Sequence, residues 1–145
     1  MSFETYAYNL EKFLNEEFKN KVPLLVLKDK SLLYKRFRIK QAKNLSWQLR
    51  FVDGDCIEHF QLKASATIAA KCYDTGDFVK LSEIKVLDTQ YWQNAMDSYI
   101  FKSKIKTVKD PDKFDIFVAR LELASSREEY YKKKITSMFR TTFDK

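Results

Sequence analysis

The sequence holds only two glycines, two prolines, two cysteines and one histidine among its 145 residues. A loop that cradles a phosphate group needs several glycines close together, whereas Gly54 and Gly76 stand alone. The scarcity of glycine therefore excludes a P-loop and a dinucleotide-binding fingerprint. A triad with a histidine base would have to use His59, and the residues around it match no nucleophile elbow or cysteine-protease signature. We predict that the protein is not an enzyme and uses no cofactor.

The two cysteines, Cys56 and Cys72, follow no basic segment with an apolar run of the kind that directs secretion. We expect them to be reduced, buried thiols in the cytoplasm or another reducing compartment inside the cell. Together with His59 they lack the paired spacing of zinc ligands, so we predict no metal site. No apolar run has the length that a bilayer requires, and we expect no contact with a membrane.

One acidic cluster has a second interpretation, because Asp53, Asp55 and Glu58 precede the tripeptide "QLK" at 61–63. This layout resembles metal-dependent nucleases of the restriction-endonuclease type. In those enzymes carboxylates hold Mg²⁺, and the lysine of a Glu-Xaa-Lys pattern assists the water or the phosphate. Here Gln61 replaces that glutamate, and the aspartates crowd into one turn. An acidic hairpin turn is therefore the simpler interpretation, and a metal-dependent nuclease is the least favoured alternative.

Composition and patterning predict a single α+β domain over residues 1–145. Hydrophobic residues make up 45% of the chain and aromatic residues 15%, which is enough for a sizeable core. Alternating apolar and polar residues predict an antiparallel β-meander that ends at about residue 63 and has a hairpin turn at 53–55. The expected order is an N-terminal helix from Ser2 stopped by Pro23, the meander, a helix at 64–73, a segment at 78–87, a helix at 88–98, a β-hairpin, and a C-terminal helix from Ser125 or Ser126. The pattern at 78–87 fits either a strand or a helix, and we favour a strand.

The expected β-hairpin joins "YIFKSKIKTV" (99–108) to "FDIFVARLEL" (114–123). If Val108 pairs with Phe114, the residues directly opposite one another form a face that is apolar throughout. The other face then carries a row of cations, formed by Lys102, Lys104 and Lys106.

Positive charge is concentrated in one part of the chain. The formal net charge is +7, and residues 21–50 carry nine lysines and arginines against a single aspartate. Within this segment lies "YKRFRIK" (34–40), which the alternation predicts to be part of one strand. One face of that strand would carry Tyr34, Arg36, Arg38 and Lys40, and the other would place Phe37 and Ile39 in the core.

This cationic strand face predicts binding to nucleic acid, either DNA or RNA. We hypothesise that Arg36, Arg38 and Lys40 contact backbone phosphates and that Tyr34 stacks on a base. The three lysines of the expected β-hairpin would support this binding if the two rows of cations share one surface, which the sequence leaves open. Because phosphate contacts carry no sequence information, binding should have low sequence specificity.

The aromatic content is also typical of a different class of protein. Twelve phenylalanines and eight tyrosines would suit a rigid subunit that buries aromatic faces against copies of itself or another protein. Such a subunit would be a homo-oligomer, a structural or accessory component of a viral particle, or an inhibitor of an acidic protein partner. The sequence leaves these alternatives open.

Overall fold

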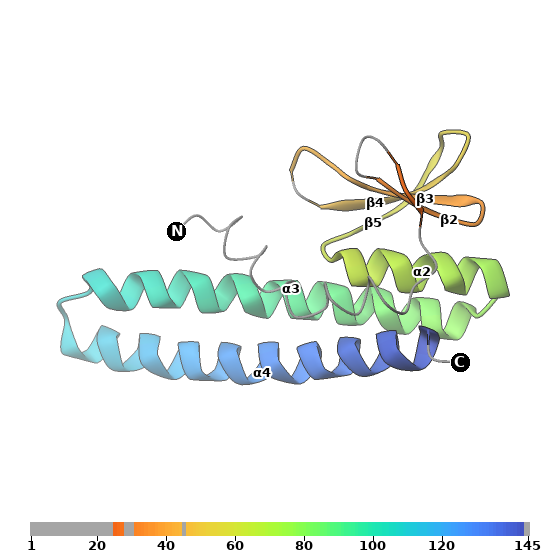
Figure 1. Ribbon diagram of the computed structural model, residues 1–145. Helices are drawn as coiled ribbons and strands as arrows, with labels where there is room; N and C mark the ends of the chain where they lie inside the picture. The colour runs from red at the N-terminus through yellow and green to blue at the C-terminus, as the bar shows by residue number, and fades with distance from the viewer. Residues whose placement is uncertain (1–24, 28–30, 45, 144–145) are drawn as a thin grey trace.

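The structure of the chain is a computed structural model that describes residues 25–27, 31–44 and 46–143. It has an α+β arrangement, as predicted, in which an antiparallel sheet is followed by helices (Figure 1). The helix expected from Ser2 lies outside the described residues. The strands are β1 (Leu25–Val26), β2 (Leu32–Tyr34), β3 (Phe37–Gln41), β4 (Trp47–Phe51) and β5 (Cys56–Phe60). The helices are α2 (Lys63–Thr75), α3 (Phe78–Thr107) and α4 (Pro111–Phe143).

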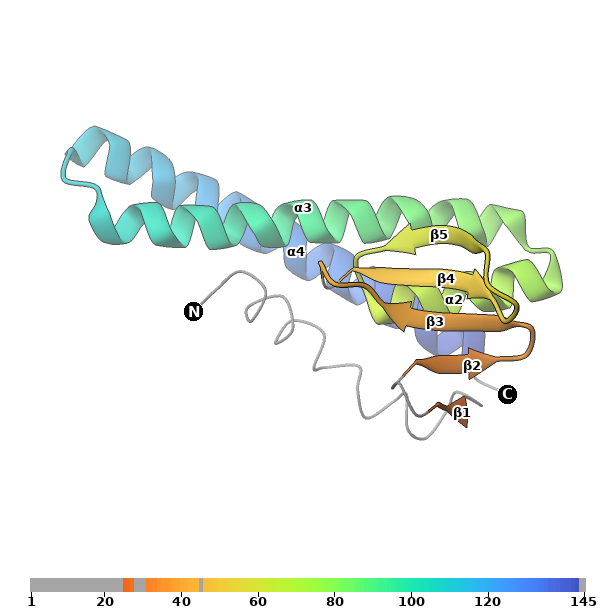
Figure 2. The same ribbon diagram turned by 90° about the horizontal axis from the view of Figure 1, so that it is seen from above.

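These elements form three layers. The helix α2 lies between the sheet and a long antiparallel hairpin made by α3 and α4 (Figures 1 and 2). The helical hairpin extends well beyond the sheet, so the turn between its helices lies at the end of the molecule away from the strands. The C-terminal end of α4 returns to the end that carries the sheet.

The sheet is the predicted meander, with strand order β1-β2-β3-β4-β5 and antiparallel neighbours. The predicted turn at 53–55 joins β4 to β5. Gly54 has a φ of 129° there, a value that residues with a side chain rarely adopt. β3 pairs with β4 over its full length, from Phe37 opposite Phe51 to Gln41 opposite Trp47. This register determines which side chains share a face of the sheet.

The stretch 34–40 is not part of one continuous strand, contrary to the prediction. Lys35 and Arg36 form a two-residue turn between β2 and β3, and Tyr34 lies directly opposite Phe37. Lys35 has a φ of 51°, the left-handed conformation that tight hairpin turns favour. Because opposed residues project from the same face of a sheet, Tyr34 points into the core beside Phe37. The turn therefore removes Tyr34 from the face that carries the cations of β3.

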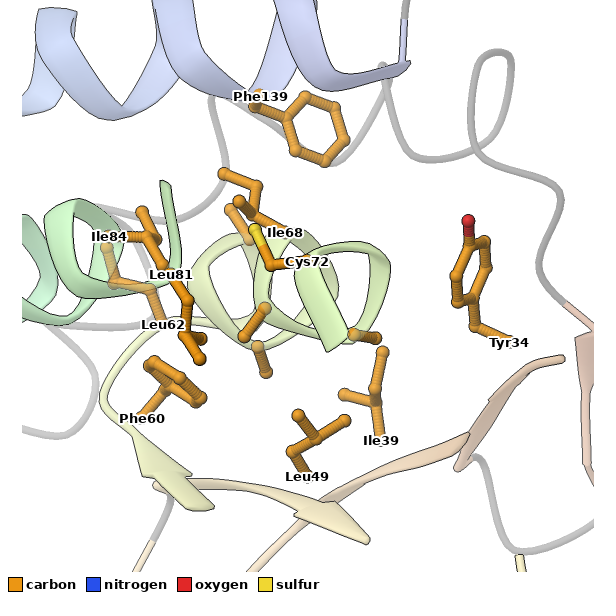
Figure 3. Close-up of a cluster of buried hydrophobic side chains, with 14 of the residues drawn as sticks. Tyr34, Ile39, Leu49, Phe60, Leu62, Ile68, Cys72, Leu81, Ile84 and Phe139 are labelled. Atoms are coloured by element: carbon orange, nitrogen blue, oxygen red, sulfur yellow. The ribbon is translucent and has the colours of Figure 1, made fainter. Parts of the chain in front are cut away.

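The core lies between the inner face of the sheet and the helices. Phe37 and Ile39 are buried, as predicted, and Leu49 from β4 points to the same side (Figure 3). The predicted alanine-rich helix is α2, whose small side chains allow its backbone to approach both neighbouring layers closely. Ile84 of α3 and Phe139 of α4 close the core from the far side of α2.

Three segments for which strands were expected or favoured are helical. Residues 78–87 and 99–107 belong to α3, Val108 follows as its C-cap, and residues 114–123 belong to α4. The predicted lysine-rich β-hairpin is therefore a helical hairpin. Asp77 caps the beginning of α3, since its side chain accepts the backbone N–H of Lys80 at 3.1 Å.

The helix α4 begins earlier than predicted. Asp110 accepts the backbone N–H of Asp112 at 2.9 Å, and Pro111 occupies the first helical position, a combination that starts helices. Ser125, one of the two expected starting points of the C-terminal helix, lies within α4, with its hydroxyl 3.5 Å from that of Ser98. The predicted C-terminal helix is thus the second part of a longer element.

Candidate nucleic-acid interface

The face of the sheet that points away from α2 carries a group of polar side chains. Successive residues of a strand point to opposite sides, so β3 and β4 alternate between the core and this face. Ile39 and Leu49 face the core, while Arg38 and Arg50 face outward directly opposite one another. We define the outer sheet face as Arg38, Lys40, Gln48, Arg50 and His59, in which Lys40 pairs with Gln48 and Gln48 pairs with His59.

The two arginines of the outer sheet face are oriented by neighbouring polar groups. Arg38 Nε donates a hydrogen bond to Ser31 Oγ at 2.9 Å. Arg50 Nη1 donates to Gln48 Oε1 at 2.9 Å, and its Nη2 donates to the carbonyl oxygen of Gly54. Both arginines are half-buried, so each guanidinium plane is held in place by its surroundings. Oriented guanidinium groups suit the recognition of phosphate oxygens, which they bind through pairs of N–H groups.

The direct opposition of Arg38 and Arg50 is electrostatically unfavourable. Like charges that face each other across neighbouring strands destabilise a sheet. Lys40, two residues after Arg38 on the same face of β3, adds a third positive charge. The outer sheet face therefore concentrates positive charge on neighbouring positions of two strands.

Two of the four site residues predicted within 34–40 lie outside this face. Tyr34 is only 4% exposed, and its ring packs edge-on against Phe143 at a centroid distance of 6.2 Å. Burial raises the pKa of its phenol. Because the ring is buried, the prediction that Tyr34 stacks on a base is wrong. Arg36 is exposed in the turn between β2 and β3, with its guanidinium 5.1 Å from the centre of the Phe37 ring.

The three predicted lysines of the hairpin lie far from the strands. Lys102, Lys104 and Lys106 are in the last part of α3, which extends beyond the sheet in both views (Figures 1 and 2). Because side chains on a helix are rotated by about 100° per residue, these lysines do not form a single row. Lys104 Nζ lies 5.4 Å from the ring centre of Phe101 and 5.3 Å from that of Phe117. The two cationic segments therefore do not share one surface, contrary to the hypothesis.

The acidic cluster that resembles a nuclease site does not assemble. Asp53 and Asp55 are exposed in the turn between β4 and β5. Glu58 instead lies on the inner side, where it accepts hydrogen bonds from Tyr73 Oη and Lys85 Nζ, each at 3.0 Å. Burial and the hydrogen bond to Glu58 raise the pKa of Tyr73 to about 12. Within the part of the chain that the structure describes, no three acidic, cysteine or histidine side chains lie close enough to hold a metal ion.

The two cysteines are both free thiols in different environments. Cys72 is buried in the core, as predicted, and burial raises the pKa of its thiol to about 11. Cys56 was predicted to be buried and is instead exposed at the beginning of β5, with its Sγ 3.6 Å from Nε2 of His59.

Sequence reasoning missed three members of the outer sheet face, namely Gln48, Arg50 and His59. A usable signal was present, because the alternation of the strand at 47–51 places Gln48 and Arg50 opposite its apolar residues. In a meander this strand lies beside the one that carries Arg38. Combining the two patterns would have added Arg50 to the predicted site.

None of the described helices is both long and apolar enough to span a membrane. Comparison with protein-family models, with curated proteins and with solved structures gives no match to this chain. The function is therefore inferred from the chemistry of the outer sheet face.

Proposed function

We propose that the protein binds the phosphate backbone of a nucleic acid through the outer sheet face, with low sequence specificity. The observation that carries this proposal is the pairing of Arg38 with Arg50 across β3 and β4, with Lys40 next to them on the same face. Three cations on neighbouring positions of one sheet face give it a local positive potential that attracts anions. A polyanion supplies several phosphates at once, which matches a row of cations better than a single small anion does.

The proposal assigns specific roles to these side chains. Arg38 and Arg50 contact phosphate oxygens through their planar N–H groups, and Lys40 supplies a third positive charge. Gln48 already accepts a hydrogen bond from Arg50, so it holds that guanidinium in position. The proposal includes no catalytic step. It locates the protein inside the cell, in a compartment where an exposed thiol such as Cys56 stays reduced.

A double substitution with a matched control tests the proposal. The Arg38→Gln/Arg50→Gln variant removes both opposed charges, and the Lys102→Gln/Lys106→Gln variant removes the same net charge from the end of the helical hairpin. Binding to labelled single-stranded DNA, single-stranded RNA and duplex DNA is measured by fluorescence anisotropy at fixed salt. We expect the arginine variant to bind at least about tenfold more weakly, because it loses two charge-assisted contacts. The control variant should bind within about twofold of the parent.

Two results would contradict the proposal. Equal binding by the parent and the arginine variant would show that the outer sheet face is only a solvated surface. Equal losses in the arginine variant and the lysine control would show that total net charge, and not this face, attracts the nucleic acid. Thermal unfolding of both variants checks that each retains its fold.

A second candidate function, a protein-interaction subunit, is favoured by a different observation. Several large apolar side chains of the helical hairpin are exposed, including Ile116 at 57% and Leu123 at 49%. Exposed apolar groups of this size are typical of surfaces that contact other proteins. This candidate predicts a complex in solution and no binding to nucleic acid at physiological salt.

A further inference from the structure

The helix α4 carries a second apolar stripe in addition to the face that packs on α3. Ile116, Leu123 and Tyr130 are 57%, 49% and 54% exposed, and they recur every seven residues. The buried residues of α4, such as Ala124 and Ile135, belong to a different side of the helix. In a coiled coil, apolar residues occupy the a and d positions of a seven-residue repeat, and this stripe supplies one of those two positions in three successive heptads.

The charges beside this stripe follow the same repeat. If Ile116, Leu123 and Tyr130 are the a positions of successive heptads, the preceding g positions are all acidic: Asp115, Glu122 and Glu129. The e positions, four residues after each a position, are all basic: Arg120, Arg127 and Lys134. All six charged side chains are exposed. We call these nine residues the α4 seam.

We propose that the α4 seam binds the α4 seam of a second copy of this chain, with the two helices parallel. In a parallel pair of coiled helices, the g residue of one helix lies beside the e residue five positions later in the other. Glu122 would then face Arg127 of the second copy, and the other two acidic residues would meet basic partners in the same way. Each of these contacts occurs twice in the dimer because of its two-fold symmetry.

The same charges disfavour the opposite orientation. In an antiparallel pair, g residues face g residues and e residues face e residues, so acids would meet acids and bases would meet bases. The d positions, Ala119, Ser126 and Lys133, are small or polar, so the seam is narrow and its apolar area is modest. We therefore expect a weak dimer, with a dissociation constant on the order of tens of micromolar. The seam is also accessible, because α4 lies on the side of the helical hairpin away from the sheet along most of its length (Figure 1).

Charge-reversal variants of the full chain test the pairing by sedimentation equilibrium. Glu122→Lys and Arg127→Glu should each weaken the homodimer about tenfold, since each replaces two attractions by two repulsions. An equimolar mixture of the two variants should dimerise as well as the parent, because every reversed pair is then attractive again. Asp53→Lys, which makes the same charge change in the turn between β4 and β5, should leave dimerisation unchanged. A monomeric parent up to about 0.5 mM, or a mixture no better than its components, overturns the proposal.

Disulfide cross-linking tests the orientation in the same conditions. In a Cys56→Ser background, Ile116→Cys places one thiol near the turn of the helical hairpin. In the parallel dimer two such thiols adjoin, so mild oxidation should give a covalent dimer in high yield. In an antiparallel dimer this residue would lie opposite Lys133 at the other end of the seam of the second copy, and little cross-linking would occur. A dimer that forms without this cross-link therefore contradicts the parallel arrangement.

Discussion

The carboxylate of Asp88, on α3, accepts the backbone N–H of Leu62, at the beginning of α2, at 3.0 Å. The same carboxylate accepts the N–H of Gln61 at 2.9 Å. Leu62 is the N-cap residue of α2, and its own side chain cannot accept a hydrogen bond, so Asp88 caps the helix from another element. Asp88 is only 4% exposed, and it joins the end of the sheet to two helices.

Asp88→Ala should destabilise the protein by about 2–4 kcal/mol, because it leaves two backbone N–H groups at a buried site without an acceptor. The matched control is Asp97→Ala on the same helix, where the carboxylate only accepts a hydrogen bond from exposed Gln93 at 3.3 Å. The control should change the free energy of unfolding by less than about 0.5 kcal/mol. Urea denaturation of both variants checks the prediction, and similar losses would show that Asp88 has no special role.

The pH dependence of stability should also report on Asp88. Burial raises the pKa of its carboxyl from 3.8 to about 6, although the N–H groups of Gln61 and Leu62 lower it in part. The folded protein therefore holds this proton more tightly than the unfolded chain does. The resulting stabilisation is complete below pH 3.8 and is lost as the pH rises through about 6.

The difference in unfolding free energy between the parent and Asp88→Ala isolates this effect, because other carboxyl groups titrate in both proteins. We expect this difference to decrease by about 2 kcal/mol between pH 4 and pH 7. Chemical denaturation at several pH values gives the curve. A difference that is constant over this range, or that increases with pH, would mean that the carboxyl keeps its ordinary pKa or a lower one.

Phe37→Ala should destabilise the fold by about 3–5 kcal/mol, since this ring is 1% exposed and stacks on Phe51 at a centroid distance of 5.9 Å. Phe78→Ala is the control, because Phe78 is 61% exposed and its loss should cost less than about 1 kcal/mol. Thermal unfolding of the two variants gives the comparison. Equal shifts in melting temperature would contradict the assignment of Phe37 to the core.

Binding to nucleic acid should weaken as salt increases, because each neutralised phosphate releases counterions. The logarithm of the binding constant falls against the logarithm of salt concentration by about 0.7–0.9 for each contact. Arg38→Gln/Arg50→Gln should therefore reduce the magnitude of this slope by about 1.5 relative to the parent. Anisotropy titrations at four or more salt concentrations provide the slopes, and a variant with an unchanged slope would remove these arginines from the interface.

The strands of the meander were predictable because two independent local signals agree there. Between β4 and β5, Gly54 marks the turn and the apolar alternation of the flanking residues gives the strands. The turn at Lys35 and Arg36 was not predictable in the same way. This turn contains no glycine, asparagine or proline, which are the usual signals of a turn. The alternation of apolar and polar residues also continues through it, so the sequence did not indicate that the chain reverses there.

The helical hairpin was misinterpreted because antiparallel helices and antiparallel strands both bring residues on either side of a turn together. Phe101, for example, contacts Phe117 across the two helices at a centroid distance of 5.9 Å. The distinguishing signals were the caps, Asp77 before α3 and Asp110 with Pro111 before α4. These short sequences indicate where helices begin. They are a better guide to secondary structure here than the alternation of lysines at 102–106, which was interpreted as a strand.

Only part of the candidate site was predicted. Arg38 and Lys40 were assigned to a solvent face, which β3 confirms, because the alternation within that strand is regular. Arg50 was omitted because its position opposite Arg38 depends on the register between two strands. Register follows from the length of the connecting turn and from the packing of the core, and neither is visible in a single segment.

The contact between Tyr34 and Phe143 has a consequence for the order of folding. The meander and the helical hairpin consist mainly of contacts between adjacent segments, which close short loops and form rapidly. The edge-on packing of these two rings joins segments from opposite ends of the described chain, and the hydrogen bond from Lys71 Nζ to the carbonyl oxygen of Thr142 ties the last turn of α4 to α2. Docking of the last turn of α4 should therefore follow the rate-limiting step. Phe143→Ala should accelerate unfolding in stopped-flow experiments while leaving the refolding rate nearly unchanged.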